Sequence, residues 1–203
     1  VIVRKNEPPA FASFLVDENG FDPNPVISPV PDGLPYPFWE SDDGEIKLSP
    51  DKQYLVANHG SEIGLEICEF NSSTGAVEFM YTQTAPIAGT GIWGLEFSPD
   101  SKLLYLCIKE SYQYFAIYQY DMQFISDSTW FKNSAILIGS GNAYDLQIAR
   151  DGKIYCSAMW QLPEINNHFL SVIHNPWIRG TGCSFENNAI FLGTNSCVST
   201  FPN

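Results

Sequence analysis

The chain has 203 residues, of which 44% are hydrophobic and 14% aromatic, as expected for a folded protein with a sizeable core. Its formal net charge of -13, from 23 acidic and 10 basic residues, argues against a nucleic-acid partner, because binding to phosphates needs clustered lysine and arginine. No apolar run reaches the roughly 20 residues that a membrane-spanning helix needs, so we expect no membrane insertion.

The first part of the chain, residues 1–43, is predicted to be an incomplete β unit followed by a connector rich in proline and acidic residues. Short β runs cover 1–3, 11–16 and 26–30, and the sequence Asp-Glu-Asn-Gly at 17–20 predicts a tight turn after the second run. Prolines flank the third run. Because proline removes a backbone donor from the ladder, we expect that run to be an outer edge strand.

A phrase of apolar strand, turn and apolar strand then occurs three times. It reads IKLSPD at 46–51, LEFSPD at 95–100 and LQIARD at 146–151, each followed by a second apolar run. The turn aspartates are 49 and 51 residues apart. Proline presets φ in a turn and aspartate bonds back to nearby backbone amides, so the phrase predicts a hairpin turn. A repeat of this length is typical of stacked or ring-shaped β architectures.

Three repeat units follow one another, at 44–90, 91–140 and 141–203, the last with a C-terminal tail. The candidate strands lie at 45–48, 53–57, 65–70 and 76–81, at 91–97, 103–108, 114–120 and 135–138, and at 143–148, 153–157, 169–174 and 189–192. Four short antiparallel strands in about 50 residues are typical of a β-propeller blade, because each blade buries both faces of its sheet against its neighbours. We therefore expect an all-β fold, a β-propeller of about four four-stranded blades with almost no helix. An open sandwich is the alternative.

The first strand of each unit should be innermost, and these strands carry polar residues at one repeat position. The residues are Lys47, Glu96 and Gln147. Side chains at this position are predicted to line a wet central channel.

No constellation for catalysis is found in the sequence. It contains no G-x-S-x-G elbow, no Walker or dinucleotide-binding glycine pattern, and no metal-binding spacing among its three histidines. Asp42, Asp43 and Glu45 offer oxygens for calcium, but without the spacing of an EF-hand. We therefore predict no catalytic residue and no cofactor, with calcium as the alternative.

Aromatic side chains on or beside loops are candidate contacts with a partner. Tyr112, Tyr114 and Trp130 lie in such places and could anchor a protein or a glycan. Packing beneath the loops is the alternative.

The five cysteines show no C-x-x-C spacing, so a zinc or redox motif is not expected. Cys107 and Cys156 occupy the same place in two repeats and are predicted to be buried thiols. Cys183 and Cys197 lie in the C-terminal part and would pair in a disulfide if the chain is exported.

Several phrases, in their order along the chain, resemble a known family. The phrases are WGLEFSPDSKLLYL at 93–106, IYQYD at 117–121, LQIARDGKIY at 146–155, VIHNP at 172–176 and FPN at 201–203. Together they resemble the WD40-like or YVTN-like β-propeller of Bacteroidetes surface proteins associated with type 9 secretion and gliding motility.

The resemblance implies an exported protein, extracellular or on the outer cell surface. Its propeller would be a non-enzymatic interaction or scaffold module in adhesion or gliding. The implied partners are proteins or glycans at the cell surface, or other domains of the same polypeptide. YVTN-like rings also resemble lactonase propellers, so an enzyme acting on a sugar lactone is the alternative. Asp127-Ser128-Thr129 resembles the pattern at which Bacteroidetes attach O-glycans, which makes Ser128 a predicted glycosylation site.

Rings of this family usually have more blades than this chain supplies. The resemblance therefore implies either part of a larger ring or a small closed ring. In the closed ring, residues 197–201 would supply the innermost strand that the first unit lacks.

Overall fold

A computed structural model of the chain describes residues 1–6, 8–31, 44–58, 64–85, 91–111, 114–141, 143–158, 168–197 and 201. These residues form three four-stranded sheets, one three-stranded sheet and a two-stranded hairpin. Every strand pairing among them is antiparallel.

The three-stranded N-terminal sheet consists of β1 (Ile2–Asn6), β2 (Pro9–Ser13) and β5 (Val26–Pro29), in the order β1-β2-β5. β5 is an edge strand of this sheet, as its flanking prolines predict. Between β2 and β5 the chain forms the hairpin of β3 (Val16–Asp17) and β4 (Gly20–Phe21), whose turn is the predicted Asp-Glu-Asn-Gly.

Three blades follow, each with its strands adjacent in chain order. The first blade contains β6 (Ile46–Leu48), β7 (Tyr54–Asn58), β8 (Leu65–Asn71) and β9 (Ala76–Gln83). The second contains β10 (Gly91–Phe97), β11 (Leu103–Ser111), β12 (Tyr114–Asp121) and β13 (Ile136–Gly141). The third contains β14 (Leu146–Ile148), β15 (Ile154–Cys156), β16 (Phe169–Ile173) and β17 (Phe185–Phe191).

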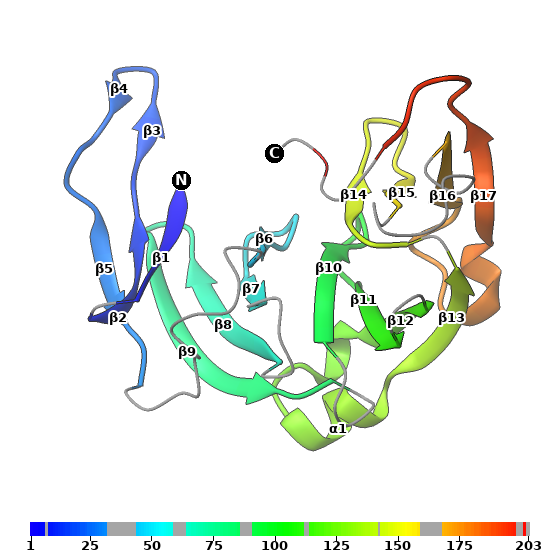
Figure 1. Ribbon diagram of the computed structural model, residues 1–203. Helices are drawn as coiled ribbons and strands as arrows, with labels where there is room; N and C mark the ends of the chain where they lie inside the picture. The colour runs from blue at the N-terminus through cyan, green and yellow to red at the C-terminus, as the bar shows by residue number, and fades with distance from the viewer. Residues whose placement is uncertain are drawn as a thin grey trace.

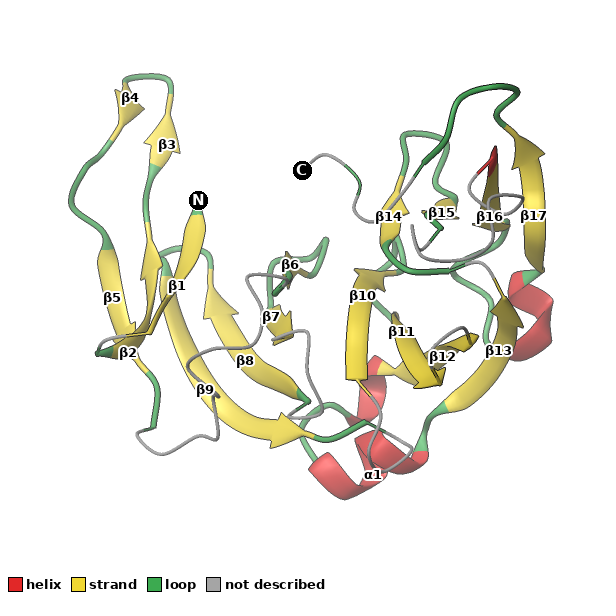
Figure 2. Ribbon diagram, viewed as in Figure 1, coloured by secondary structure: helices red, strands yellow, loops and turns green. Residues whose placement is uncertain are grey.

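The four sheets succeed one another round an arc, as Figure 1 shows. β6, β10 and β14 lie nearest the centre of the picture, and β5, β9, β13 and β17 lie at the outside. Figure 2, coloured by secondary structure, shows strands throughout and helix only at the margin. The predicted fold class, an all-β propeller with the first strand of each blade innermost, is confirmed.

Burial on both faces of each blade explains this arrangement, and β11 shows it best. Leu104 and Leu106 pack in the core between the first and second blades, whereas Leu103, Tyr105 and Cys107 pack in the core between the second and third. These five side chains are at most 4% exposed. Because side chains alternate across a strand, a run of apolar residues fits only a strand that is covered on both faces.

The repeated turn has the same geometry in all three blades. Lys52, Ser101 and Gly152 occupy its fourth position with φ of 60°, 60° and 78°. In the first blade the Asp51 carboxylate accepts the Gln53 N–H at 3.1 Å. The aspartates of the other two turns accept the corresponding N–H, which confirms their predicted role as turn residues.

Several strand bounds differ from the predictions by a few residues, and the start of β17 differs most. β17 begins at Phe185, four residues before the predicted start at 189, because Phe185 pairs with Ile173 and packs into the core between the second and third blades. The described residues also contain one short α-helix, α1 (Ser128–Asn133), and the 3₁₀ turns η1 (Met122–Phe124) and η3 (Gly180–Cys183). The α-helix is only six residues long, in agreement with the expectation of almost no helix.

Candidate functional site

Charged side chains gather where the innermost strands approach one another. Lys47 Nζ lies 2.8 Å from Glu45 Oε1 and 3.4 Å from Glu96 Oε2. The three side chains are only 16%, 14% and 8% exposed, respectively. The structure thus joins two of the predicted channel residues, Lys47 and Glu96, in an ion pair. The third, Gln147, is half-buried in β14 opposite Tyr155.

Glu45, Lys47, Glu96 and the buried Asp145 are called the axial cluster below, and its carboxylates connect successive parts of the ring. Each accepts a backbone N–H from further along the chain: Leu95 to Glu45 at 2.9 Å, Ile148 to Glu96 at 3.0 Å and Phe201 to Asp145 at 2.7 Å. The first bond joins the residue before β6 to β10, and the second joins β10 to β14. Residues 198–200, which hold most of the predicted closing strand, lie outside the described residues.

Burial perturbs the titration of the cluster. It raises the pKa of Glu45 to about 7, against the opposing effect of Lys47, and it also raises the pKa of Asp145. Burial acts to lower the pKa of Lys47, but Glu45 and Glu96 outweigh it and the pKa is raised. These carboxylates are mostly engaged by backbone amides and one lysine, so the cluster holds the blades together.

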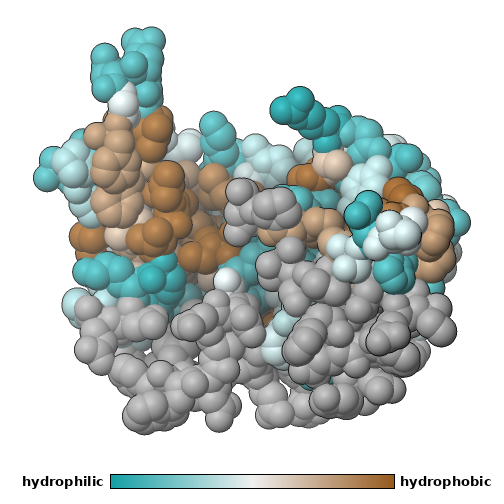
Figure 3. All heavy atoms as spheres, turned by 45° about the horizontal axis from the view of Figure 1, so that its top comes forward, coloured by the Kyte–Doolittle hydropathy of each residue, from teal (hydrophilic) through white to brown (hydrophobic). Residues whose placement is uncertain are grey.

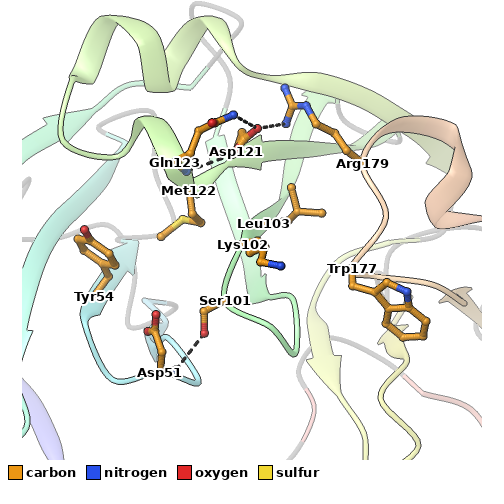
Figure 4. A pocket seen from close by; sticks show the side chains of 10 residues that line it. All are labelled: Asp51, Tyr54, Ser101, Lys102, Leu103, Asp121, Met122, Gln123, Trp177 and Arg179. Atoms are coloured by element: carbon orange, nitrogen blue, oxygen red, sulfur yellow. Dashed lines mark hydrogen bonds and ion pairs between the residues drawn. The ribbon is translucent and has the colours of Figure 1, made fainter.

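A pocket of about 460 Å³ opens on the face that carries the repeated turns (Figure 4). Buried Leu103 and Met122 form its apolar base, and buried Ser101 lies beside them in the lining. Tyr54 and Trp177 line it from the first and third blades and lie at opposite sides of the view. Trp177 is 49% exposed, so much of its indole is available to a ligand.

Charged and amide groups surround this turn-face pocket. Asp121 accepts the Gln123 side chain at 2.7 Å, and Arg179 Nη1 lies 3.7 Å from the same Asp121 oxygen. Arg179 Nη2 donates to the Ser134 carbonyl at 2.6 Å. Lys102 and Asp51 complete the polar lining.

The loop that carries Trp177 and Arg179 is held in place by two fully buried side chains of the second blade. Tyr105 donates its hydroxyl to the Pro176 carbonyl at 2.9 Å. Gln119 donates to the Ile178 carbonyl at 2.9 Å and accepts the Gly180 N–H at 2.8 Å. Gln119 also donates to the Tyr105 hydroxyl at 2.6 Å. The backbone on both sides of Trp177 is therefore fixed by a connected polar network.

Trp130, one of the predicted contact residues, is not among the described residues that line this pocket. Trp130, on α1, is 62% exposed and stacks on Phe124 with ring centroids 6.1 Å apart. Tyr114 begins β12, and Tyr112 lies outside the described residues. Ser128, the predicted glycosylation site, is exposed at the first position of α1.

The predicted disulfide between Cys183 and Cys197 is not formed in the structure, in which all five cysteines are free. Cys183 is instead fully buried in the core between the second and third blades, together with Cys107 and Cys156. Its apolar surroundings explain this placement, because a free thiol packs as a small hydrophobic group. Cys197 is half-buried in the C-terminal segment.

Sequence reasoning missed the pocket residues Trp177, Arg179 and Asp121. The first two lie between the predicted strands at 169–174 and 189–192, and Asp121 directly follows the predicted strand at 114–120. The available signal was a tryptophan and an arginine after an Asn-Pro turn, in a loop without a counterpart in the other repeats.

Of the residues proposed for calcium, Asp42 and Asp43 lie outside the described residues. In the described part, no group of three or more His, Cys, Asp or Glu side chains could hold a metal ion.

This arrangement of sheets and turns defines the chain as a β-propeller. No family model and no curated protein matches the sequence. Solved structures do resemble it. One is a protein from Lactobacillus plantarum, with 13% identity, a TM-score of 0.49, and coverage of 94% of this chain and 50% of that one.

Two further solved structures are similar. TolB from Acinetobacter baumannii has 13% identity and a TM-score of 0.44, with coverage of 87% of this chain and 39% of that one. The β-propeller domain of Cps50 (Swd1) from Myceliophteria thermophila has 15% identity and a TM-score of 0.45, with coverage of 84% and 52%. The chain therefore spans about half or less of each of these three structures. No helix among the described residues is long and apolar enough to cross a membrane.

Proposed function

We propose that this propeller is a non-enzymatic interaction module of an exported bacterial surface protein, acting in adhesion or gliding. The observation that carries the proposal is the exposed apolar surface of residues 1–27. This segment contains seven of the thirteen exposed large hydrophobic side chains among the described residues. Surfaces of this kind mark contacts with other proteins, because water is released when they are covered. Figure 3 shows the brown apolar residues at the left, below a teal tip.

The β3–β4 hairpin is the most exposed part of this surface. Leu15, Val16 and Phe21 are 60%, 55% and 59% exposed. Phe21 stacks on Phe14 with ring centroids 5.3 Å apart, and the Asp22 N–H donates to the Leu15 carbonyl at 3.0 Å. The hairpin is thus ordered before binding, which lowers the entropic cost of association.

The hairpin also carries acidic but no basic side chains. Asp17, Glu18 and Asp22 are all exposed, and the sequence from 6 to 46 contains no lysine or arginine. The partner that fits is a protein with an apolar cleft bordered by lysine or arginine, because opposite charges steer and orient the contact.

Site-specific photocrosslinking in cells that produce the full-length protein tests this proposal. A benzoylphenylalanine replaces Phe21, and in a matched control it replaces Lys132, which is exposed on α1. We expect one discrete crosslinked protein from position 21, located in the cell envelope or outside the cell, and none from position 132. Equal products from both positions, no product from position 21, or a cytoplasmic partner would contradict the proposal.

A second candidate function is the hydrolysis of a sugar lactone. It is favoured by Glu45, whose pKa of about 7 suits a general base, beside Lys47 at 2.8 Å. An assay of gluconolactone hydrolysis with the wild-type chain and Glu45→Gln tests it. The absence of hydrolysis above the rate in buffer, or full activity of Glu45→Gln, would exclude this site as a lactonase.

A further inference from the structure

We propose that the turn-face pocket binds an uncharged saccharide. This inference rests on the proposed role as a binding module, but it uses a surface separate from the β3–β4 hairpin. Three properties of the pocket support it: an exposed indole, a preformed loop and a balanced set of charges.

The exposed indole, at the edge of the pocket in Figure 4, offers a face for the C–H groups of a sugar ring. Trp177 is 49% exposed although it lines a pocket with a buried apolar base of Leu103 and Met122. An aromatic face attracts C–H groups that carry partial positive charge, as the axial C–H groups of a pyranose do. The volume of about 460 Å³ lies within the usual range of about 300–1,000 Å³ for small-molecule sites and gives room for a mono- or disaccharide unit.

The position of Trp177 is fixed before any ligand binds. The carbonyls of the residues on either side of it, Pro176 and Ile178, accept hydrogen bonds from Tyr105 and Gln119, both fully buried. Tyr105 and Gln119 thus connect this loop to the interior of the second blade. These hydrogen bonds fix the backbone from which the indole projects, which reduces the entropy lost on binding.

The charges around the pocket favour a ligand without net charge. The lining contains two acidic residues, Asp51 and Asp121, and two basic residues, Lys102 and Arg179. Arg179 is near Asp121, and Lys102 Nζ lies 3.4 Å from Asp100. For an anionic or a cationic ligand, attraction to one half of the lining would therefore be offset by repulsion from the other half. Sugar hydroxyls both donate and accept, so they can bond to carboxylate, guanidinium and amide groups together.

Binding of the purified chain to an array of neutral and acidic glycans, followed by calorimetry with the neutral oligosaccharides that bind, tests the inference. We expect binding to neutral glycans, and a loss of affinity of about tenfold or more in Trp177→Ala. Trp130→Ala is the matched control, because Trp130 is also an exposed tryptophan but is not among the residues that line the pocket, and the affinity of this variant should be unchanged. Circular dichroism establishes that each variant is folded.

Three outcomes would overturn the inference. They are binding to acidic glycans only, no binding to any neutral glycan at millimolar concentration, and saccharide binding that Trp177→Ala leaves intact. None of these outcomes affects the crosslinking at Phe21, so failure of the saccharide site and failure of the proposed function can be told apart.

Discussion

The ion pair between Arg4 and Glu66 connects the N-terminal sheet to the first blade, and its removal tests how much this contact contributes to stability. Arg4 Nε donates to Glu66 Oε2 at 3.0 Å, and Nη2 donates to Oε1 at 2.9 Å. The side chains are 8% and 1% exposed. Arg4→Ala would therefore leave a carboxylate buried without its cation, and we expect a loss of about 3–5 kcal/mol in the free energy of unfolding.

Urea unfolding followed by tryptophan fluorescence, with wild type and variant compared at the same neutral pH, measures this loss.

Two further variants isolate the ion pair. Lys5→Ala removes the neighbouring exposed cation of β1 and should change stability by no more than about 0.5 kcal/mol. Arg4→Met combined with Glu66→Leu removes both charges and should be much less destabilised than Arg4→Ala. A loss below about 1 kcal/mol for Arg4→Ala would refute the reasoning.

Three other predictions concern the fold. Lys52→Gly should raise the free energy of unfolding by about 1 kcal/mol in thermal denaturation, because φ is 60° there, whereas Gly152→Ala at the equivalent position should lower it by a similar amount. The free energy of unfolding of the wild-type chain should fall by up to roughly 3 kcal/mol as the pH rises from about 4.5 to about 7, because folded Glu45 keeps its proton up to a pKa of about 7. Glu45→Gln should flatten this dependence in urea titrations, and an unchanged slope would contradict the prediction. Phe131→Ala should cost about 3–5 kcal/mol, since this ring is fully buried against Tyr120, whereas Trp130→Ala next to it should cost under about 1 kcal/mol; similar losses in denaturant titrations would contradict the burial of α1.

The candidate site was less predictable than the fold. Lys47 and Glu96 were placed together correctly on the innermost strands, because a repeat position fixes the place of a side chain relative to the ring axis. Their ion pair could not be derived, since it depends on the distance between two blades. The pocket formed by Asp51, Asp121 and Trp177 could not be derived either, because these residues come from three blades and no repeat position links them.

What the sequence by itself determined is the repeat. The Ser-Pro-Asp turn and the alternation of side chains along β11 are set within about ten residues by φ preferences and strand geometry, and these local rules are sufficient to define a propeller blade. Only the tertiary structure decided which side chains meet across blades. The packing of apolar faces sets the rotation of each sheet, and this rotation brings Gln119 to the loop of Trp177 and Arg4 to Glu66. The same packing places the Cys183 thiol in the core between the second and third blades, where it is free and not part of a disulfide.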